Sequence, residues 1–269
     1  MNNKSIRILL SEAKKMHYSY NSGFKNLISS YAWPILLLIQ TFYSYQSFDF
    51  SAGIWADFNS PKHVIVYLLL GFVGYNSFML LVTGAFYTRR EREDGTLEAI
   101  FQTPANRLSI LFGRALGSSV ANASLFILFG IVITIITGEV SRMIFLWPFV
   151  FVLMLITGSI WGAFINSIFL FSRDIDIIFT ILDEPMSFFA GVKFPVSILP
   201  IGVRLISNLF PLSAILALMR EMTLGNNHID IVSNLLLLFV ISDIFIVLTV
   251  IIEKKAEAYN TENGSFNLF

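Results

Sequence analysis

Long apolar runs without a charged residue limit this chain to a membrane-spanning helical fold. A helix of roughly 20 residues crosses the hydrocarbon core of a bilayer, and several runs approach or exceed that length. Only 13% of the residues are charged, against about 25% in a soluble domain. We therefore predict an all-α integral membrane protein with six spans. The predicted spans are residues 26–48, 63–88, 115–138, 143–172, 174–189 and 231–252.

The segment between the fifth and sixth predicted spans, residues 190–228, is too apolar for an ordinary loop. Three prolines divide it into short pieces. Short helices and irregular backbone are tolerated at membrane depth only where protein or a water-filled cavity covers them. We predict a re-entrant hairpin of two short helices, over about 196–208 and 212–223.

The distribution of Lys and Arg predicts the orientation of the chain. If both termini are cytoplasmic, 13 of these residues lie inside and five lie outside. Cytoplasmic loops of membrane proteins carry such an excess. We predict a multi-pass protein of the cell (plasma) membrane with both termini cytoplasmic and the re-entrant hairpin outside. Residues 253–269 then form a short cytoplasmic tail.

Residues 1–25 precede the first span and have the pattern of an amphipathic helix. Five apolar residues share one helical face, and basic residues occupy the other. Such a helix lies on the inner leaflet, where Lys and Arg reach anionic headgroups. A cytosolic helix packed on protein is the alternative. The apolar residues are Ile6, Leu9, Leu10, Ala13 and Met16, and the basic ones are Arg7, Lys14 and Lys15.

The charged segment between the second and third spans, residues 89–103, is where the chain meets something soluble. Seven of its 36 charged residues fall within residues 89–99. Thr88 and Glu91 fit a capping box that starts a helix. Thr103, followed by proline, suits the N-cap of the third span. An apolar stripe on the helix suits a groove on a partner protein, although a solvated loop with an interfacial helix fits equally well. The stripe consists of Leu97, Ile100 and Phe101.

Two motifs resemble those of the ABC type-2 exporter permeases. Residues 93–98 read EDGTLE and are followed by Thr103-Pro104, which is similar to the E-x-G-T-L-E…T-P signature of that family. About 80 residues later, 185–195 read PMSFFAGVKFP, similar to the outer re-entrant region. The motifs are in the family's order and on the sides that the charge count predicts. The resemblance covers essentially the whole chain, 1–269, as one transmembrane permease domain.

The resemblance implies a permease subunit that works with a second permease copy, identical or related, and two cytosolic ABC ATPase subunits. Residues 89–103 then contain the coupling helix that docks into the ATPase. The chain has no G-x-x-x-x-G-K-[ST] phosphate loop, so ATP and Mg would be bound by the partner and this chain would not be the enzyme. The predicted coupling residues are Glu91, Glu93, Asp94, Gly95, Thr96, Leu97, Glu98, Ile100 and Phe101.

Acidic residues inside the predicted spans are candidates for a translocation path. Asp183 and Glu184 lie in the fifth span and Asp243 in the sixth, where charges usually face a bundle interior or a wet cavity. The alternatives are pairing with Arg204 or Arg220 for the first two, and buried structural pairing for Asp243. The predicted translocation path or outer gate consists of Asp183, Glu184, Phe194, Pro195, Arg204, Arg220 and Asp243.

Two G-x-x-x-G pairs, Gly113/Gly117 and Gly158/Gly162, predict close helix packing. The packing is either within one subunit or between two.

The function that these features predict is ATP-driven export of an amphipathic substrate: a drug, an antimicrobial peptide, a lipid or a lipid-linked glycan. The alternative is an ion-gradient-driven secondary transporter that uses Asp183, Glu184 and Asp243. A membrane-embedded enzyme or a metal site is not expected, because the three histidines lie singly and the chain has no cysteine. Basic and acidic residues number 18 each, and no nucleic-acid partner is predicted. A bacterial origin and contact with membrane lipid are expected.

Overall fold

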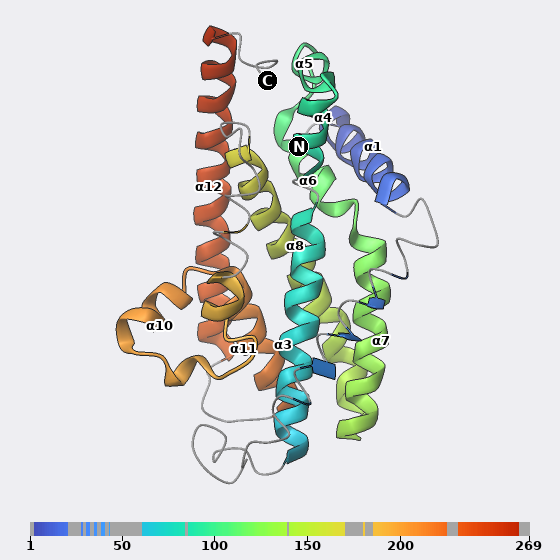
Figure 1. Ribbon diagram of the computed structural model, residues 1–269, viewed down its shortest axis with the longest axis vertical. Coiled ribbons are helices and arrows are strands. Elements are labelled where there is room, and N and C mark those ends of the chain that lie inside the picture. The colour runs from blue at the N-terminus through green and yellow to red at the C-terminus, as the bar shows by residue number, and fades with distance from the viewer. Residues whose placement is uncertain are drawn as a thin grey trace.

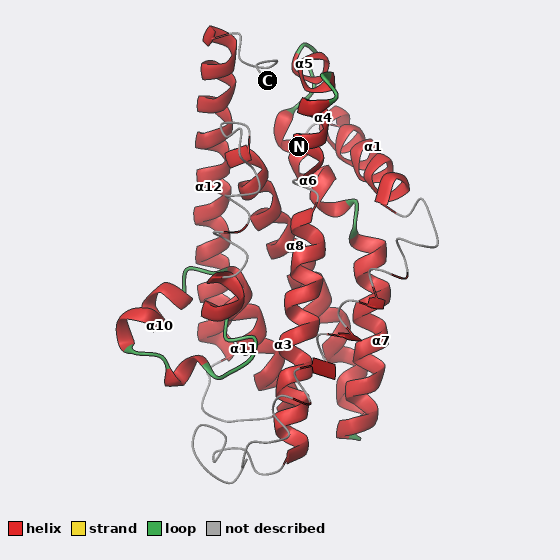
Figure 2. Ribbon diagram, viewed as in Figure 1, coloured by secondary structure: helices red, strands yellow, loops and turns green. Residues whose placement is uncertain are grey.

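The computed structural model consists of helices joined by loops and turns, with no strand among the residues that it describes (Figure 2). This confirms the predicted all-α fold class. The described residues are 3–20, 28, 31–32, 35–36, 39–40, 43, 61–83, 86–138, 140–169, 180, 185–224 and 231–263.

The described part of the chain contains ten α-helices and one 3-10 helix. The α-helices are α1 (Asn3–Tyr20), α3 (Pro61–Val82), α4 (Phe86–Glu93), α5 (Thr96–Phe101), α6 (Arg107–Leu116), α7 (Ser119–Thr137), α8 (Val140–Phe169), α10 (Ile201–Ser207), α11 (Pro211–Leu224) and α12 (Ile231–Asn263). A 3-10 helix, η3 (Val196–Ile198), precedes α10. Four long helices, α3, α7, α8 and α12, run along the length of the molecule, while α1, α4, α5 and α6 gather at one end (Figure 1).

Three helices are long and apolar enough to cross a membrane: α3 over 62–82, α8 over 145–169 and α12 over 231–256. Helices α10 and α11 meet at 95° and together make either one broken span or a re-entrant loop. Most residues of the predicted first and fifth spans lie outside the described residues. The described residues therefore contain three or four candidate spans, and three of these, α3, α8 and α12, coincide with predicted spans.

The predicted third span begins differently from our expectation. Residues 104–106 are not helical, and α6 starts at Arg107 with Asn106 as its N-cap, so the predicted N-cap at Thr103 was wrong. The side chain of Asn106 accepts a hydrogen bond from the backbone N–H of Ser109 at 3.2 Å. The span is also broken after Leu116, because α6 ends there and α7 begins at Ser119.

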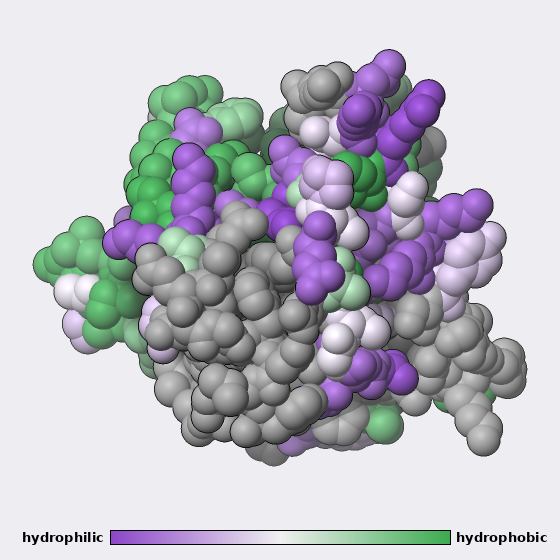
Figure 3. Space-filling model, turned by 90° about the horizontal axis from the view of Figure 1, so that it is seen from above, coloured by the Kyte–Doolittle hydropathy of each residue, from purple (hydrophilic) through white to green (hydrophobic). Residues whose placement is uncertain are grey.

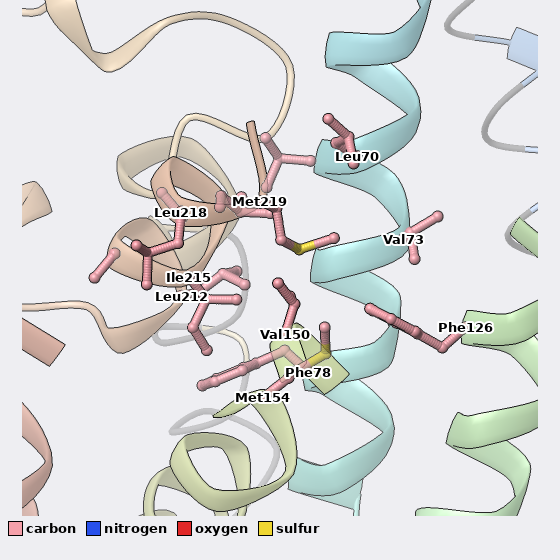
Figure 4. Close-up of a cluster of buried hydrophobic side chains, with 14 of the residues drawn as sticks. Leu70, Val73, Phe78, Phe126, Val150, Met154, Leu212, Ile215, Leu218 and Met219 are labelled. Atoms are coloured by element: carbon pink, nitrogen blue, oxygen red, sulfur yellow. The ribbon is translucent and has the colours of Figure 1, made fainter. Parts of the chain in front are cut away.

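A core of apolar side chains holds α3, α7, α8 and α11 together (Figure 4). Phe78 of α3, Met154 of α8 and Leu212 of α11 are completely buried in it. Inside a membrane, lipid is as apolar as these side chains, so close van der Waals packing rather than the hydrophobic effect holds the helices together. Helix α3 lies at the centre of this packing.

Both glycine pairs pack within the chain, which confirms packing within one subunit. A Cβ at Gly162 would lie 2.9 Å from the carbonyl oxygen of Leu81, and one at Gly158 would collide with the Leu81 side chain. The pair on α6, Gly113 and Gly117, faces α1.

Candidate coupling site

Helices α4 and α5 form a helical elbow, residues 86–101, at the end of the molecule where α1 also lies (Figure 1). Seen from that end, hydrophilic side chains gather on the side of α1, α4 and α5, whereas α10 is hydrophobic (Figure 3). The turn between α4 and α5 depends on Gly95, whose φ of 68° is rare for residues with a side chain. The Asp94 N–H donates to the Arg90 carbonyl at 2.8 Å.

The start of α4 differs from the predicted capping box. Helix α4 begins at Phe86, so Thr88 lies inside the helix rather than at its N-cap. The hydroxyl of Thr96 instead bridges the elbow, because it donates to the Glu91 carbonyl at 3.2 Å. A helix does lie where the capping box predicted one, but it begins earlier in the chain, at Phe86.

The end of α5 is fixed by three hydrogen bonds to one acceptor, the carbonyl of Ile100. The Thr103 N–H donates to it at 3.2 Å, the Thr103 hydroxyl at 2.7 Å and the Arg107 guanidinium at 3.0 Å. The last carbonyls of a helix lack partners within the helix. Thr103, predicted to cap the third span, thus caps the end of α5, and Arg107 connects α5 to α6.

The turn of the elbow is a solvent-exposed surface. Glu93, Asp94, Gly95 and Thr96 are exposed, and Ile100 is half-buried. The side chains of Leu97, Glu98 and Phe101 lie outside the described residues. The predicted stripe is thus described only at Ile100.

Glu91 differs from the other predicted coupling residues whose side chains the structure describes, because its side chain is buried beneath the elbow. Its carboxylate pairs with the Arg114 guanidinium of α6 and with the Lys15 ammonium of α1, the latter at 2.6 Å. It therefore lies where it can hold the elbow in position, whereas its exposed neighbours form the outer surface.

Four charged residues from three helices form an ion-pair network: Glu12, Lys15, Glu91 and Arg114. Besides its bond to Glu91, Arg114 pairs with Glu12 at 3.3 Å, and Lys15 pairs with Glu12 at 3.4 Å. The Arg114 side chain is only 2% exposed, whereas that of Lys15 is 50% exposed. Removing one partner of a buried pair leaves an uncompensated charge, which is strongly destabilising. The network therefore ties α1, α4 and α6 together.

Helix α1 packs directly on α6 beside this network. A Cβ at Gly113 would lie 2.7 Å from the Leu9 carbonyl oxygen and 2.9 Å from Glu12 Cβ, and one at Gly117 would collide with Met16. The alternative of a helix packed on protein therefore describes one side of α1. Ile6 and Leu10 remain exposed on the helix, and this is the surface that our lipid-contact prediction requires.

A groove of about 660 Å³ separates α1 from the elbow. Lys15 and Met16 line it from α1, and Tyr87, Arg90 and Asp94 line it from the elbow. Basic and acidic side chains face one another across this groove. The ion-pair network holds the buried side of the elbow, and the exposed turn on its other side is accessible to a partner.

Arg220, one of the predicted outer-gate residues, contacts two other parts of the described core. Arg220 of α11 donates to the Val192 carbonyl at 3.1 Å, and its guanidinium lies 3.5 Å from the ring centroid of Tyr67 on α3. Gly71 permits this contact, because a Cβ there would collide with the Val192 carbonyl. Arg220 thus holds the segment before η3 against α3.

The remaining gate residues are dispersed. Arg204 donates to the carbonyls of Ser197 and Leu199 within its own hairpin. Phe194 and Pro195 are half-buried, and Asp183 and Glu184 lie outside the described residues. Asp243 is exposed on α12.

Sequence reasoning missed Glu12, Lys15 and Arg114 as site residues. Arg114 contacts residues 23 and 102 positions away along the chain, beyond the reach of helical periodicity. The sequence feature that could have indicated Arg114 is its position directly before a charge-free apolar run.

The structure defines the chain as a polytopic helical membrane protein with an exposed helical elbow at its polar end. The family model of the ABC-2 family transporter protein matches residues 10–251. The chain therefore belongs to the ABC-2 transporter family. Membership makes it the membrane subunit of an ABC transporter, which partners with an ABC ATPase subunit and is generally not itself catalytic. A search of curated proteins gave no significant match.

Proposed function

We propose that this chain is the permease of an ATP-driven exporter in the cell membrane and that its elbow is the docking element for the ATPase. The observation that carries the proposal is the exposed turn Glu93–Thr96 on two short helices that the ion-pair network ties to α6 and α1. A docking element needs an accessible surface and a stiff connection to the spans, and this elbow has both.

The mechanism follows from these connections. Two ATPase subunits that close on ATP move the two elbows of a permease pair. Each elbow transmits the movement through Glu91 to Arg114 and through the Ile100 carbonyl to Arg107, and both arginines are on α6. Closure of the ATPase thus rocks the spans and opens a path at the interface between the permeases.

The outer end of the path is proposed to be closed by the hairpin of η3, α10 and α11. This assignment requires six spans, cytoplasmic termini and the hairpin at the outer surface. The Arg220 contact with Val192 supports it, because it fixes the start of the hairpin to α3. The proposed cargo is amphipathic: a drug, an antimicrobial peptide, a lipid or a lipid-linked glycan.

The test is ATP hydrolysis and export by the chain reconstituted in lipid with its co-purifying ATPase. Glu93→Lys changes the exposed turn, and Ile100→Pro interrupts α5, since proline in the last turn of this helix removes a backbone donor and clashes with the preceding turn. We expect both variants to lose cargo-stimulated ATP hydrolysis while the permease stays folded. Lys62→Glu is the matched control, a charge reversal at an exposed position at the opposite end of α3.

Normal export by both elbow variants would overturn the coupling assignment. Export that persists without any ATPase and stops when the proton or sodium gradient is collapsed would overturn the ATP-driven function itself.

A further inference from the structure

A groove runs between α7 and α8 in the part of these helices that is far from the elbow. It has a volume of about 460 Å³, within the range of roughly 300–1,000 Å³ of pockets that hold small molecules. Ile135 and Val140 line one end of it, next to the turn that joins the two helices. Helix α7 leads away from α6 and the elbow (Figure 1), so this groove is separate from the coupling site.

The groove follows α7 over about three helical turns. Ala123 lines its other end, and the distance from Ala123 to Ile135 along the helix axis is about 18 Å. One leaflet contributes half of the roughly 30 Å of hydrocarbon in a bilayer. The groove is therefore about as long as the apolar part of one leaflet is thick.

The groove is open on the side that a membrane would cover. Ile127, Ile131 and Ile135 line it at intervals of four residues, and they are 61%, 56% and 75% exposed. Among the described residues that line it, only Thr134 and Trp147 have polar side chains. A hydrocarbon chain in this groove would make van der Waals contacts along its whole length, whereas a polar ligand would lose most of its hydrogen bonds to water.

Three aromatic rings form a wall of the groove. The indole of Trp147 lies 4.8 Å from the ring of Phe126, which lies 5.2 Å from the ring of Phe151. Gly130 leaves room for the indole, because a Cβ there would lie 3.3 Å from Trp147 Cδ2. Pro148 also lines the groove and lies inside α8, where proline removes a backbone hydrogen bond and bends the helix. Such a bend accounts for a gap between two helices that are in contact at Phe126.

Trp147 provides the groove with an unused hydrogen-bond donor. Its Nε1–H is buried and has no hydrogen-bond partner among the described residues, and a buried donor without an acceptor is costly. The Thr134 hydroxyl, in contrast, already donates to the Gly130 carbonyl at 2.7 Å. The apolar stretch of α8 begins at Phe145, so Trp147 lies about 3 Å inside its boundary along the helix. This is the depth at which phospholipid acyl chains join the headgroup region, where tryptophan is enriched.

We propose that one acyl chain of a phospholipid occupies this groove and that its ester carbonyl accepts a hydrogen bond from Trp147 Nε1–H. An ester carbonyl only accepts and an indole N–H only donates, so the two groups are complementary. The headgroup then lies at the turn between α7 and α8, and the acyl chain extends toward Ala123. This lipid is a resident ligand that joins α7 to α8, and it is distinct from the cargo. The proposal rests on the proposed function only in assigning the lipid to the outer leaflet.

The experiment measures the phospholipid that the purified chain retains, by mass spectrometry of the intact protein. The chain is transferred into lipid-free detergent from vesicles of equal parts dipalmitoyl- and dilauroyl-phosphatidylcholine. Thr134→Phe fills the groove. Val132→Phe is the matched control, because valine and threonine are similar in size and Val132 is 38% exposed on α7 without lining the groove. We expect the natural chain and Val132→Phe to retain one phospholipid, and Thr134→Phe to retain about tenfold less, a factor that corresponds to 1.4 kcal/mol.

Two further substitutions test the hydrogen bond and the length of the groove. Trp147→Phe keeps an aromatic ring but has no donor, and it should lower the retained lipid about twofold to tenfold, the range expected for one hydrogen bond. Ala123→Phe shortens the groove at its deep end. We expect the natural chain to retain the dipalmitoyl lipid in preference to the shorter dilauroyl lipid, and Ala123→Phe to lose this preference.

Equal retention by Thr134→Phe and Val132→Phe would refute the groove as the site, and a retained molecule that does not have the mass of a phospholipid would refute the lipid. Unchanged retention by Trp147→Phe would refute the hydrogen bond, and an unchanged preference in Ala123→Phe would refute the placement of the acyl chain. None of these measurements requires the ATPase. Its co-purification is measured separately, so failure of the lipid site and failure of the ATPase partnership are separate results.

Discussion

Arg114 is the residue whose replacement should most weaken the coupling site. Its side chain is 2% exposed and pairs with both Glu12 and Glu91. The substitution Arg114→Met retains the apolar length of the side chain but removes the charge. It leaves Glu91 buried, with only the half-exposed Lys15 as a partner.

The expected loss of stability follows from the burial of the ion pair between Glu91 and Arg114. Breaking a buried ion pair by removing one partner costs about 3–5 kcal/mol. For a chain of this size each kcal/mol lowers the melting temperature by roughly 2–4 °C, so we expect a decrease of roughly 6–20 °C. Lys15→Met removes a half-exposed charge and should cost at most about 1 kcal/mol.

The assay is thermal unfolding of the purified chain in detergent, and the double variant Glu91→Met/Arg114→Met is the decisive control. Replacing a whole buried pair with apolar residues is often neutral, and Glu12 and Lys15 still pair with each other at 3.4 Å. The double variant should therefore recover most of the stability that Arg114→Met loses. The reasoning would be wrong if the double variant lost as much stability as the single variants Glu91→Met and Arg114→Met together. It would also be wrong if Arg114→Met lowered the melting temperature no more than Lys15→Met does.

Three further substitutions test other contacts. Gly95→Ala should cost about 1–2 kcal/mol in thermal unfolding, because an alanine at positive φ is strained although no atom lies within 4 Å of the new Cβ. Gly117→Val should cost about 1–3 kcal/mol by overpacking against Met16, and limited proteolysis should then cleave α1 faster. Arg220→Met should expose a cysteine introduced at Val192, which is 1% exposed, and thiol labelling would measure it.

The sequence predicted those parts of the fold that local chemistry determines. Proline positions delimited the hairpin, and α11 begins at Pro211, within one residue of the predicted helix start. The apolar runs located α3, α8 and α12, because their lengths follow from the thickness of the bilayer. The G-x-x-x-G pairs predicted close approach, and packing within one chain was one of the two expected outcomes.

The parts that were missed depend on contacts distant in sequence. Helix α6 ends with Gly117 as its C-cap, and the Gly117 N–H donates to the Arg114 carbonyl at 3.1 Å. The Ser118 hydroxyl donates to the Leu80 carbonyl at 2.7 Å, and the Asn122 amide to the Ser77 carbonyl at 2.6 Å. Both acceptors are on α3, so a neighbouring helix provides the contacts at the break. The capping box failed for a related reason, since Glu91 pairs with Arg114 rather than with the start of its own helix.

The length of α5 explains why these distant contacts are required. A helix of six residues does not form by itself, because nucleation is unfavourable and few hydrogen bonds follow it. Its shape must come from both ends: the turn at Gly95 and the three donors on the Ile100 carbonyl. One of those donors is Arg107 of α6, and Arg114 of the same helix holds Glu91. A force on the exposed turn therefore reaches α6 at two points seven residues apart, about 10 Å along the helix, and so acts to tilt α6 as well as displace it.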